Sequence, residues 1–275
     1  MTVQEIIDGI IKKTGLEPLD YEKTCDHLMM GDPNHEVRKI ATTFMATVEV
    51  IEKAAEMGVD FIITHEPTWF TGMDDTKWVQ EDRVYLEKKA LIEKNNIAIW
   101  RFHDHMHMEK DGDGIYRGFD QKTGWGGYHI PNAPGMEHFG CCYEIPEVTL
   151  TQLAGFFKER FGMDVIQIVG NAQAKIKRVG VLVGGGSLGL GTEEMPMKLM
   201  NDNQLDLAIC GDITEWTLSA YIRDAAALGM NKAMLVLGHE RSEEAGMEYL
   251  GDWLKDVTKD IPVLFIDAGE PFGYL

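Results

Sequence analysis

Histidine and carboxylate residues gather at three places in the chain, and each place directly follows a short apolar run of the kind that forms a buried strand. The three clusters are His65 with Glu66, residues 103–107, and residues 239–243. Together they hold five of the nine histidines, so the concentration is unlike a random scatter. Imidazole nitrogens and carboxylate oxygens are ligands that divalent zinc, iron, manganese, cobalt and nickel accept in proteins. The three clusters therefore predict a metal site.

The second cluster packs three histidines and an aspartate into the run His103-Asp104-His105-Met106-His107. If the preceding strand continued through this run, His103, His105 and His107 would project to one face and Asp104 to the other. A turn would group the same side chains differently, and both arrangements stay open at this point. Asp104 is also a candidate for a bridging carboxylate or a proton-transfer group.

The third cluster places His239 and Glu243 four residues apart. In a helix this spacing puts both side chains on one face, where they can grip a single cation. An ordinary acidic helix N-terminus would carry similar residues, because glutamate there interacts favourably with the helix dipole. The occurrence of three such clusters at three strand ends favours the metal-ligand interpretation.

Strands and helices alternate around these clusters. Apolar runs at 59–63, 97–102 and 233–237 predict the strands that precede the three clusters, and amphipathic stretches between them predict helices. This alternation is typical of α/β folds with parallel strands. Because the carboxyl ends of parallel strands meet at one edge of a sheet, the fold offers a way to bring distant clusters together.

A stretch rich in glycine, proline and aromatic residues over 124–140 indicates a domain boundary or a lid. Since the third cluster has to meet the first two, we expect the C-terminal unit to return to the first sheet. Residues 1–125 and 232–275 are then expected to form a discontinuous metal-binding α/β domain, with residues 126–231 inserted as a second α/β domain. The glycine-rich run 184–191 predicts a tight turn, because it lacks the Lys-Ser/Thr pair of a P-loop.

Composition narrows the class of protein. The formal net charge of -19 disfavours binding to nucleic acid and to anionic membranes. No apolar run approaches the ~20 residues that a membrane span needs, and the acidic N-terminal segment is unlike a signal peptide. The four cysteines have no Cys-x-x-Cys spacing, which is typical of reduced thiols. We therefore expect a cytoplasmic protein with no membrane partner.

With these residues in place, the sequence resembles the Nif-three-like family of dinuclear-metal proteins, also labelled GTP cyclohydrolase type two homologues. The resemblance covers most of the chain and is carried by the segments 40–44, 61–67, 103–107, Gly211-Asp212 with Glu215, and 238–243. The family pattern has two adjacent histidines after a strand, a histidine followed four residues later by aspartate, and a late Gly-His-x-x-x-Glu. His65, His239 and Glu243 match this pattern directly.

Two positions depart from the family pattern. Glu66 stands where the second histidine usually lies, and His107 stands where the aspartate would fall. One carboxylate and one imidazole are thus exchanged, which leaves the charge and metal capacity of the set similar. Asp104 is the alternative to His107 for the aspartate position. The ligand pool that the residues and the resemblance together imply is His65, Glu66, His103, His107, His239 and Glu243.

The resemblance implies a Nif-three-like α/β fold of two domains with mixed sheets and the metal site in the cleft between them. It also implies two divalent metal ions per chain, from zinc, iron, manganese, cobalt or nickel, and assembly as a homo-oligomer, namely a toroidal hexamer. The length of the chain fits the short form of the family, without the extra inserted domain of longer members.

The leading functional hypothesis is a dinuclear-metal-dependent hydrolase that acts on a C–N or phosphoester bond of a small molecule. Two cations can lower the pKa of a bridging water and polarise the group that it attacks. Asp104 and Glu215 are the candidate catalytic residues. The alternative is a non-catalytic, ring-forming metal-binding scaffold, sensor or metal-transfer protein. An amidohydrolase-like barrel, suggested by His103-x-His105, fits less well because too little chain follows this motif.

Overall fold

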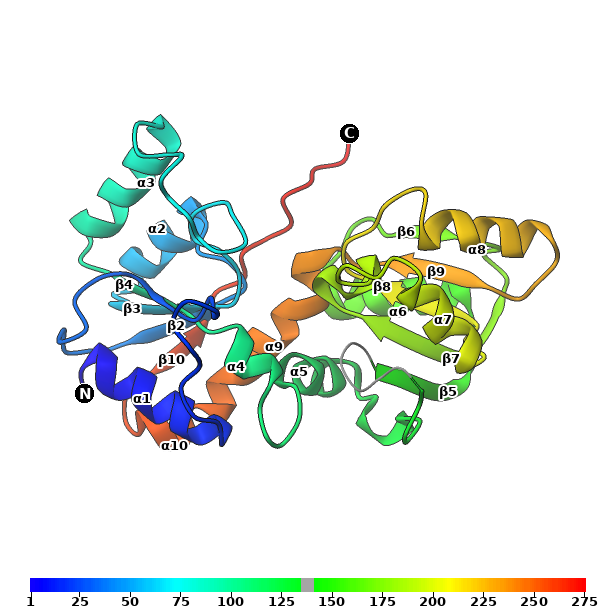
Figure 1. Ribbon diagram of the computed structural model, residues 1–275, viewed down its shortest axis with the longest axis horizontal. Helices are drawn as coiled ribbons and strands as arrows, with labels where there is room; N and C mark the ends of the chain where they lie inside the picture. Colours follow the sequence, from blue (N-terminus) through cyan, green and yellow to red (C-terminus); the bar gives the residue numbers. More distant parts are fainter. Residues whose placement is uncertain (135–140) are drawn as a thin grey trace. The chain divides into compact units, whose positions relative to one another are not determined.

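The computed structural model describes residues 1–134 and 141–275, which form two compact units. The first unit comprises Met1–Gly118 and Glu244–Gly269, and the second comprises Phe119–Glu243 and Glu270–Leu275. The last part of the expected boundary or lid, residues 135–140, lies outside the described residues. Each unit is built on its own five-stranded sheet with helices packed against it (Figure 1).

The first unit has a sheet with the strand order β1-β4-β3-β2-β10. Its strands are β1 (Leu28–Met30), β2 (Ile40–Thr43), β3 (Phe61–Thr64), β4 (Ala98–Arg101) and β10 (Val263–Phe265). Its helices are α1 (Val3–Thr14), α2 (Val48–Glu56), α3 (Arg83–Lys94), α4 (Asp104–His107) and α10 (Lys255–Thr258). Helices α2 and α3 lie on one side of this sheet, and α1 and α10 lie on the other (Figure 1). Two of the unit boundaries fall within α5 (Gly114–Thr123) and α9 (His239–Trp253), and the third lies between Gly269 and Glu270.

The central strands of the first sheet are parallel and buried along their whole length. Strands β2, β3 and β4 pair in register, with Thr43 opposite Thr64 and Thr64 opposite Arg101. Continuous apolar runs are typical of parallel strands that are covered on both faces. This register brings the residues that follow β3 and β4, among them His65 and His103, to the same edge of the sheet, as the alternation of elements predicts.

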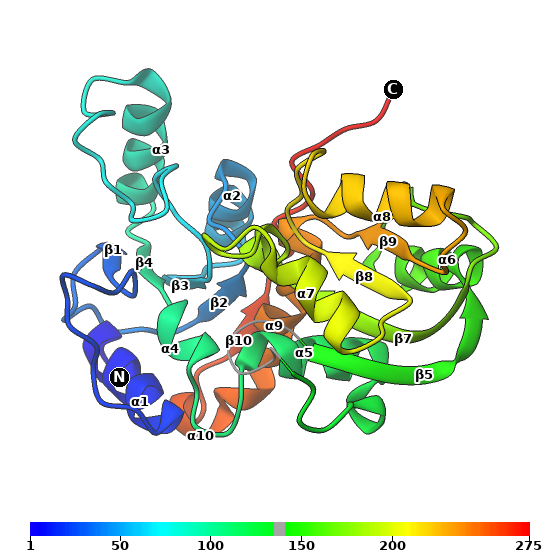
Figure 2. The same cartoon turned by 45° about the vertical axis from the view of Figure 1, so that its right-hand side comes forward.

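The second unit has a sheet with the strand order β5-β7-β8-β9-β6. Its strands are β5 (Cys141–Thr149), β6 (Gln167–Val169), β7 (Lys175–Leu182), β8 (Leu207–Cys210) and β9 (Ala233–Val236). Its helices are α6 (Leu150–Phe161), α7 (Met195–Asp202), α8 (Leu218–Ala227) and the short 3-10 helices η1 (Gly126–Tyr128) and η2 (Gly184–Leu188). Helix α6 lies on the opposite face of this sheet from α7 and α8 (Figure 2).

Both sheets are mixed, which confirms the expected fold class. In the first sheet β1 pairs antiparallel with β4, whereas the other neighbours are parallel. In the second sheet β7, β8 and β9 are parallel, and β5 and β6 flank them as antiparallel edge strands. Antiparallel edge strands on a parallel sheet are common in α/β proteins.

Strand β9 does not return to the first sheet, contrary to our expectation for residues 232–275. It pairs with β8, where Met234 lies opposite Ala208, and with β6, where Leu235 lies opposite Ile168. Met234 is fully buried in the core that β8, α7 and α8 share. From the C-terminal segment, most of α9 together with α10 and β10 belongs to the first unit. A four-residue apolar strand has no feature in its sequence that identifies which sheet it joins.

Helices α1 and α6 each begin with a capping box. Thr2 caps α1 through a capping box in which its side chain accepts a hydrogen bond from the backbone N–H of Glu5. Thr149 caps α6 in the same way with Gln152 as its partner. Each capping box satisfies two N–H groups that the first helical turn would otherwise leave unpaired. Helix α4 and the long strand β5 were not expected from the sequence.

The cysteines carry free thiols. The four cysteines, all within the described residues, form no disulfide. Burial raises the pKa of Cys210 to about 12 and that of Cys142 to about 11, so these thiols stay protonated and unreactive at neutral pH. Among the described residues, every helix is too short or too polar to traverse a bilayer.

Helix α3 buries a lysine that gives the stability of the protein a pH dependence. The Lys88 side chain is 5 % exposed, and its Nζ donates a hydrogen bond of 2.7 Å to the backbone oxygen of Thr68. Nζ also lies 5.1 Å from the ring centre of Phe70 and 5.5 Å from that of Trp69. Burial lowers the pKa of Lys88 from 10.5 to about 8. The unfolded chain therefore binds a proton at this lysine over a pH range in which the folded protein does not.

We predict that the Lys88→Met variant lacks the pH dependence of stability that Lys88 causes. A lysine whose folded pKa is lowered destabilises the fold below that pKa, and the penalty disappears as pH rises towards the unfolded pKa. Between pH 7.5 and pH 10 the wild type should therefore gain about 2 kcal/mol of unfolding free energy relative to the variant. Urea denaturation of both proteins at the two pH values measures this gain. A constant difference between them would contradict the assignment.

Candidate metal centre

Three histidine rings of the first unit face one another. His65 follows β3, His103 immediately precedes α4, and His107 ends α4. The ring centres of His65 and His103 are 4.5 Å apart, those of His65 and His107 are 5.0 Å apart, and those of His103 and His107 are 4.8 Å apart. One nitrogen from each ring lies within 4.8 Å of the other two. Three imidazole nitrogens at this spacing can contact a single divalent cation.

The second histidine cluster is a helical turn and not a continued strand. His103 occupies the N-cap position of α4 and His107 ends it, so their side chains lie one turn apart on the face that meets His65. His105 is buried elsewhere, and its Nδ1 lies 2.6 Å from Oδ2 of Asp26. The structure therefore brings together two of the three histidines of the cluster and separates the third.

Each of the clustered histidines has its Nδ1 held by an acceptor. The Nδ1 of His65 donates to the backbone oxygen of Phe102 at 3.1 Å. The Nδ1 of His103 lies 2.9 Å from a carboxylate oxygen of Asp104, and that of His107 lies 2.8 Å from one of Asp113. Because carbonyl and carboxylate oxygens only accept, these bonds fix the tautomer in which Nε2 is the metal-binding atom. Histidines that ligate metals in proteins are almost always held in this way.

His65 is neutral in this environment. Its side chain is fully buried, and burial, followed by the repulsion from His103 and His107, holds the pKa of His65 well below its usual value. A metal ligand must be the neutral imidazole, so no proton has to leave His65 before a cation binds. The chemistry of this donor set fits a divalent metal.

Asp104 lies behind His103. Its carboxylate accepts hydrogen bonds from the Thr24 hydroxyl at 2.8 Å and from the Cys25 backbone N–H at 3.1 Å, in addition to its contact with His103. Burial raises the pKa of Asp104, but the hydrogen bonds from these three groups outweigh that effect and hold it well below the usual range. Asp104 is therefore ionised and fixed in place at neutral pH.

Glu66 is held between a cation and a histidine. Its Oε2 forms an ion pair of 3.1 Å with Arg101, and its Oε1 lies 3.7 Å from Nε2 of His103. Arg101 is 3 % exposed and also contacts Asp74 at 3.3 Å and the backbone oxygen of His65 at 3.0 Å. The arginine thus fixes the loop after β3, and it points one Glu66 oxygen towards the clustered histidines.

The second unit holds the other expected ligand pair at the start of α9. The Nε2 of His239 lies 3.2 Å from Oε2 of Glu243, as the four-residue spacing in a helix predicts. The Nδ1 of His239 lies 2.9 Å from a carboxylate oxygen of Asp212, which follows β8. This is the same arrangement as at His103 and His107, with a carboxylate behind a histidine that presents Nε2.

A glycine turn packs directly against this pair. A Cβ built at Gly184 would overlap Oε1 of Glu243 and lie 2.8 Å from Nε2 of His239, so only glycine leaves space at this position. Gly184 also has a φ of 49°, and its backbone N–H donates to the Ser242 hydroxyl at 2.9 Å. The first residue of the glycine-rich run thus packs closely against the His239–Glu243 pair.

Some residues of the site were expected and others were missed. Glu215 is exposed on the loop between β8 and α8, where it stays a candidate. The roles of Asp113 and Asp212 as supports of His107 and His239 were not predicted, although Asp212 lies within a segment that carries the family resemblance. Asp26 and Thr24 were also missed, because nothing in the local sequence links them to residues about eighty positions later.

Comparisons with known proteins agree with the fold. The model of the Duf34/NIF3 (NGG1p interacting factor 3) family matches residues 1–271. The chain is 26% identical to the "GTP cyclohydrolase 1 type 2 homolog" of Clostridium perfringens over 285 aligned residues, covering 100% of both chains. Its structure is similar to that of Staphylococcus aureus protein SA1388, with a TM-score of 0.74, 19% identity and coverage of 100% of this chain and 99% of that chain.

A Bacillus cereus protein related to NIF3 has a similar structure, with a TM-score of 0.73 and 16% identity over 100% of this chain and 99% of that chain. At these identities the solved structures support the fold alone. The match of the family model, in contrast, extends over almost the whole chain. The chain therefore belongs to the Duf34/NIF3 family.

Proposed function

We propose that this protein binds two divalent metal ions per chain and uses them to hydrolyse a C–N or phosphoester bond in a small molecule. The observation that carries the proposal is the arrangement of His65, His103 and His107, whose ligand nitrogens cluster within 4.8 Å while an acceptor holds each Nδ1. If these histidines only formed ion pairs that stabilise the fold, their Nε2 atoms would not all have to face one another. The His239–Glu243 pair supplies the second set of ligands.

The donor set supports a catalytic use of the metal. Three imidazoles with a nearby carboxylate are typical of catalytic zinc sites, which keep a coordination position for water or substrate. Mixed nitrogen and oxygen ligands also suit iron, manganese, cobalt and nickel. When bound, a divalent ion supplies Lewis acidity towards water and towards a carbonyl or phosphoryl oxygen.

The residues around the ligands have separate tasks in this proposal. Glu66, oriented by Arg101, is a ligand or a proton acceptor beside His103. Asp104 orients His103, because its oxygens are already engaged by Thr24, Cys25 and His103 itself. We therefore favour an orienting role for Asp104 over the bridging role that the sequence also allows. A proton-transfer role for Glu215 stays a prediction.

The relatives support the class of substrate only through their names. Those matched by sequence are called GTP cyclohydrolase 1 type 2 homologs, and a cyclohydrolase opens a ring by hydrolysis of C–N bonds. The expected hexamer and the cytoplasmic location remain proposals that accompany this function. Light scattering of the purified chain would test the hexamer directly.

Metal analysis of tag-free protein followed by a hydrolysis screen tests the proposal. After reconstitution and gel filtration we expect two tightly held ions per chain. The loaded protein should then hydrolyse a member of a panel of nucleotides, cyclic amidines and phosphoesters, and His239→Ala should lose this activity. Fewer than one tightly held ion per chain, even after reconstitution, would refute the dinuclear site. Two ions without any hydrolysis would favour the alternative, a non-catalytic metal-binding scaffold, sensor or transfer protein.

A further inference from the structure

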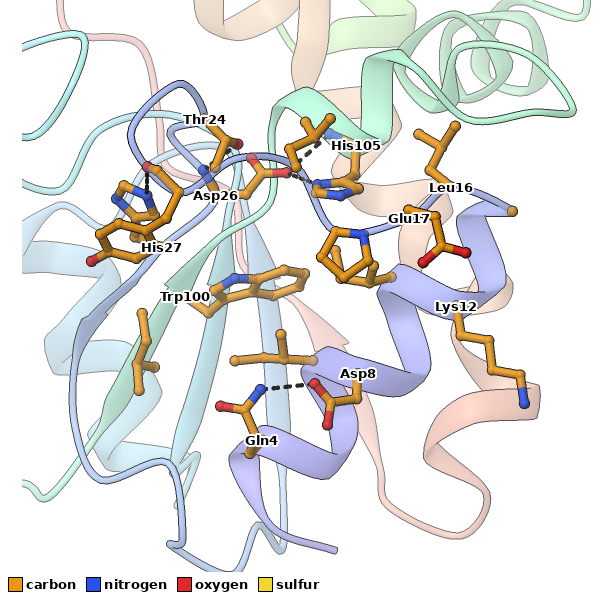
Figure 3. A pocket seen from close by; sticks show the side chains of 17 residues that line it. Gln4, Asp8, Lys12, Leu16, Glu17, Thr24, Asp26, His27, Trp100 and His105 are labelled. Atoms are coloured by element: carbon orange, nitrogen blue, oxygen red, sulfur yellow. Dashed lines mark hydrogen bonds and ion pairs between the residues drawn. The ribbon is translucent and has the colours of Figure 1, made fainter.

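Asp26 is a buried carboxylate with no ligand role, and it lies in the loop between α1 and β1. Its side chain is 1 % exposed. It accepts hydrogen bonds from the backbone N–H groups of His103 at 2.7 Å, Asp104 at 2.8 Å and His105 at 2.9 Å, and it contacts Nδ1 of His105 at 2.6 Å. Figure 3 shows Asp26 and His105 joined in this way at the wall of a pocket beside α1.

These backbone N–H groups are the ones that the first turn of a helix leaves without partners. His103, at the cap position of α4, makes no capping hydrogen bond with its own side chain. Asp26 supplies the missing acceptor from a segment 77 to 79 residues earlier in the chain. Its negative charge also lies at the positive end of the helix dipole. The four-residue helix α4 therefore depends on an external carboxylate for its first turn.

The geometry of the metal ligands depends on this turn. Four residues span roughly 6 Å along a helix but roughly 13 Å along a strand. Only the helical turn brings the rings of His103 and His107 to the observed 4.8 Å. If residues 103–107 continued as a strand, His107 would leave the cluster and a different pair of histidines would be neighbours.

A second set of hydrogen bonds, in which Thr24 and Cys25 are the donors, holds the same turn. The Thr24 hydroxyl and the Cys25 N–H donate to the carboxylate of Asp104, while Asp26 accepts from the N–H of Asp104. The segment Thr24–Asp26 and the segment His103–His105 thus exchange hydrogen bonds in both directions. We call Thr24, Cys25 and Asp26 the clamp segment.

We propose that the clamp segment, chiefly through Asp26, is a positioning element that holds His103 and His107 in their metal-binding arrangement. The inference rests on the proposed function, because it assigns these histidines as ligands. Asp26 itself touches neither the metal nor the substrate in this assignment.

The test compares Asp26→Asn with Asp60→Asn. Asparagine keeps the shape of Asp26 but replaces one acceptor oxygen by a donor, so half of its N–H partners lose their acceptor. Asp60 is a matched control in the same unit, since it is 6 % exposed and accepts from the N–H groups of Arg38 and Lys39. Both variants also carry His239→Ala, which removes a ligand of the second set. The measured affinity then reports on the ligands of the first unit.

Zn²⁺ affinity from chelator competition and the visible absorption of Co²⁺-loaded protein are the two measurements. Asp26→Asn should weaken Zn²⁺ binding by about 10- to 100-fold, as loss of an outer support typically does, and should change the Co²⁺ spectrum. Asp60→Asn should lower the melting temperature but leave affinity and spectrum unchanged. Equal affinities in the two variants would overturn the proposal. If the His239→Ala parent binds no metal, the proposed function itself fails and the inference falls with it.

Thr24→Val keeps the proposal testable if Asp26→Asn does not fold. This variant removes the hydrogen bond from the Thr24 hydroxyl to Asp104 and the one that this hydroxyl accepts from the Asp26 backbone N–H. It keeps the hydrogen bond from the Cys25 backbone N–H to Asp104 and those that Asp26 accepts from residues 103–105. A several-fold loss of Zn²⁺ affinity with an altered Co²⁺ spectrum would support positioning by the clamp segment. An affinity and a spectrum identical to those of the parent would overturn it.

Discussion

Replacing His107 with alanine is expected to abolish tight metal binding by the first unit. The variant leaves two imidazoles where three now cluster, and it removes the ring that completes the set with His65 and His103. We expect the Zn²⁺ affinity of this set to fall by at least about 1,000-fold, beyond the 10- to 100-fold typical of outer supports. Inductively coupled plasma analysis after dialysis should show one ion fewer per chain than in the wild type.

The matched control is His105→Ala, two positions away in the same cluster. His105 faces Asp26, and its ring belongs to none of the groups of potential ligands among the described residues. The helical turn predicts that this variant keeps its metal within about tenfold of wild-type affinity. If His105→Ala lost the metal and His107→Ala retained it, residues 103–107 would not form the turn described here in the metal-bound protein.

Replacing Arg101 with methionine is expected to destabilise the first unit by about 3–5 kcal/mol, the usual cost of removing one partner of a buried ion pair. Arg101 is 3 % exposed and pairs with Glu66 and with Asp74, whose side chain is 2 % exposed. Methionine fills part of the space but leaves both carboxylates without their cation. Urea denaturation of metal-free protein at pH 7.5 measures the loss.

The pH dependence of this loss identifies its cause. Burial already raises the pKa of Asp74 despite the presence of Arg101, and without the arginine it should rise further. A carboxyl group whose folded pKa exceeds its unfolded value destabilises the fold above that pKa, and acid relieves the penalty. The difference between wild type and variant should therefore shrink between pH 7.5 and pH 5.

Arg83→Met is the control for the loss of an arginine–carboxylate pair at the surface. Arg83 and Glu87 form an exposed pair one helical turn apart, so this variant should cost less than about 0.5 kcal/mol. A loss at Arg101 no larger than that at Arg83 would mean that the loop after β3 does not depend on the buried cation.

The sequence predicts the positions of the ligands better than their grouping. His65 after β3 and His239 with Glu243 on a helix lie as their local patterns indicate, because strand ends and four-residue spacing are properties of a short segment. The run 103–107 is different, since its residues fit a strand or a turn equally well. The choice between the two is made by Asp26, which lies far away in the sequence.

The placement of β9 shows a second limit of the same kind. Its four apolar residues are equally suited to the interior of either sheet, and the pairing with β8 and β6 is decided by the cores that form around it. The outer carboxylates were missed for a similar reason. Asp113 lies six residues after His107, and only the folded structure shows that it holds the His107 ring.

The backbone carbonyl of Phe102, which orients His65, affects which substitutions this protein can accept. His103, His107 and His239 are held by aspartate side chains, which a single substitution can remove. The acceptor for His65 belongs to the main chain of residue 102, so every amino acid at that position supplies it. We therefore expect residue 102 to accept other buried apolar side chains during evolution without altering the tautomer of His65, whereas the three aspartates have no such freedom.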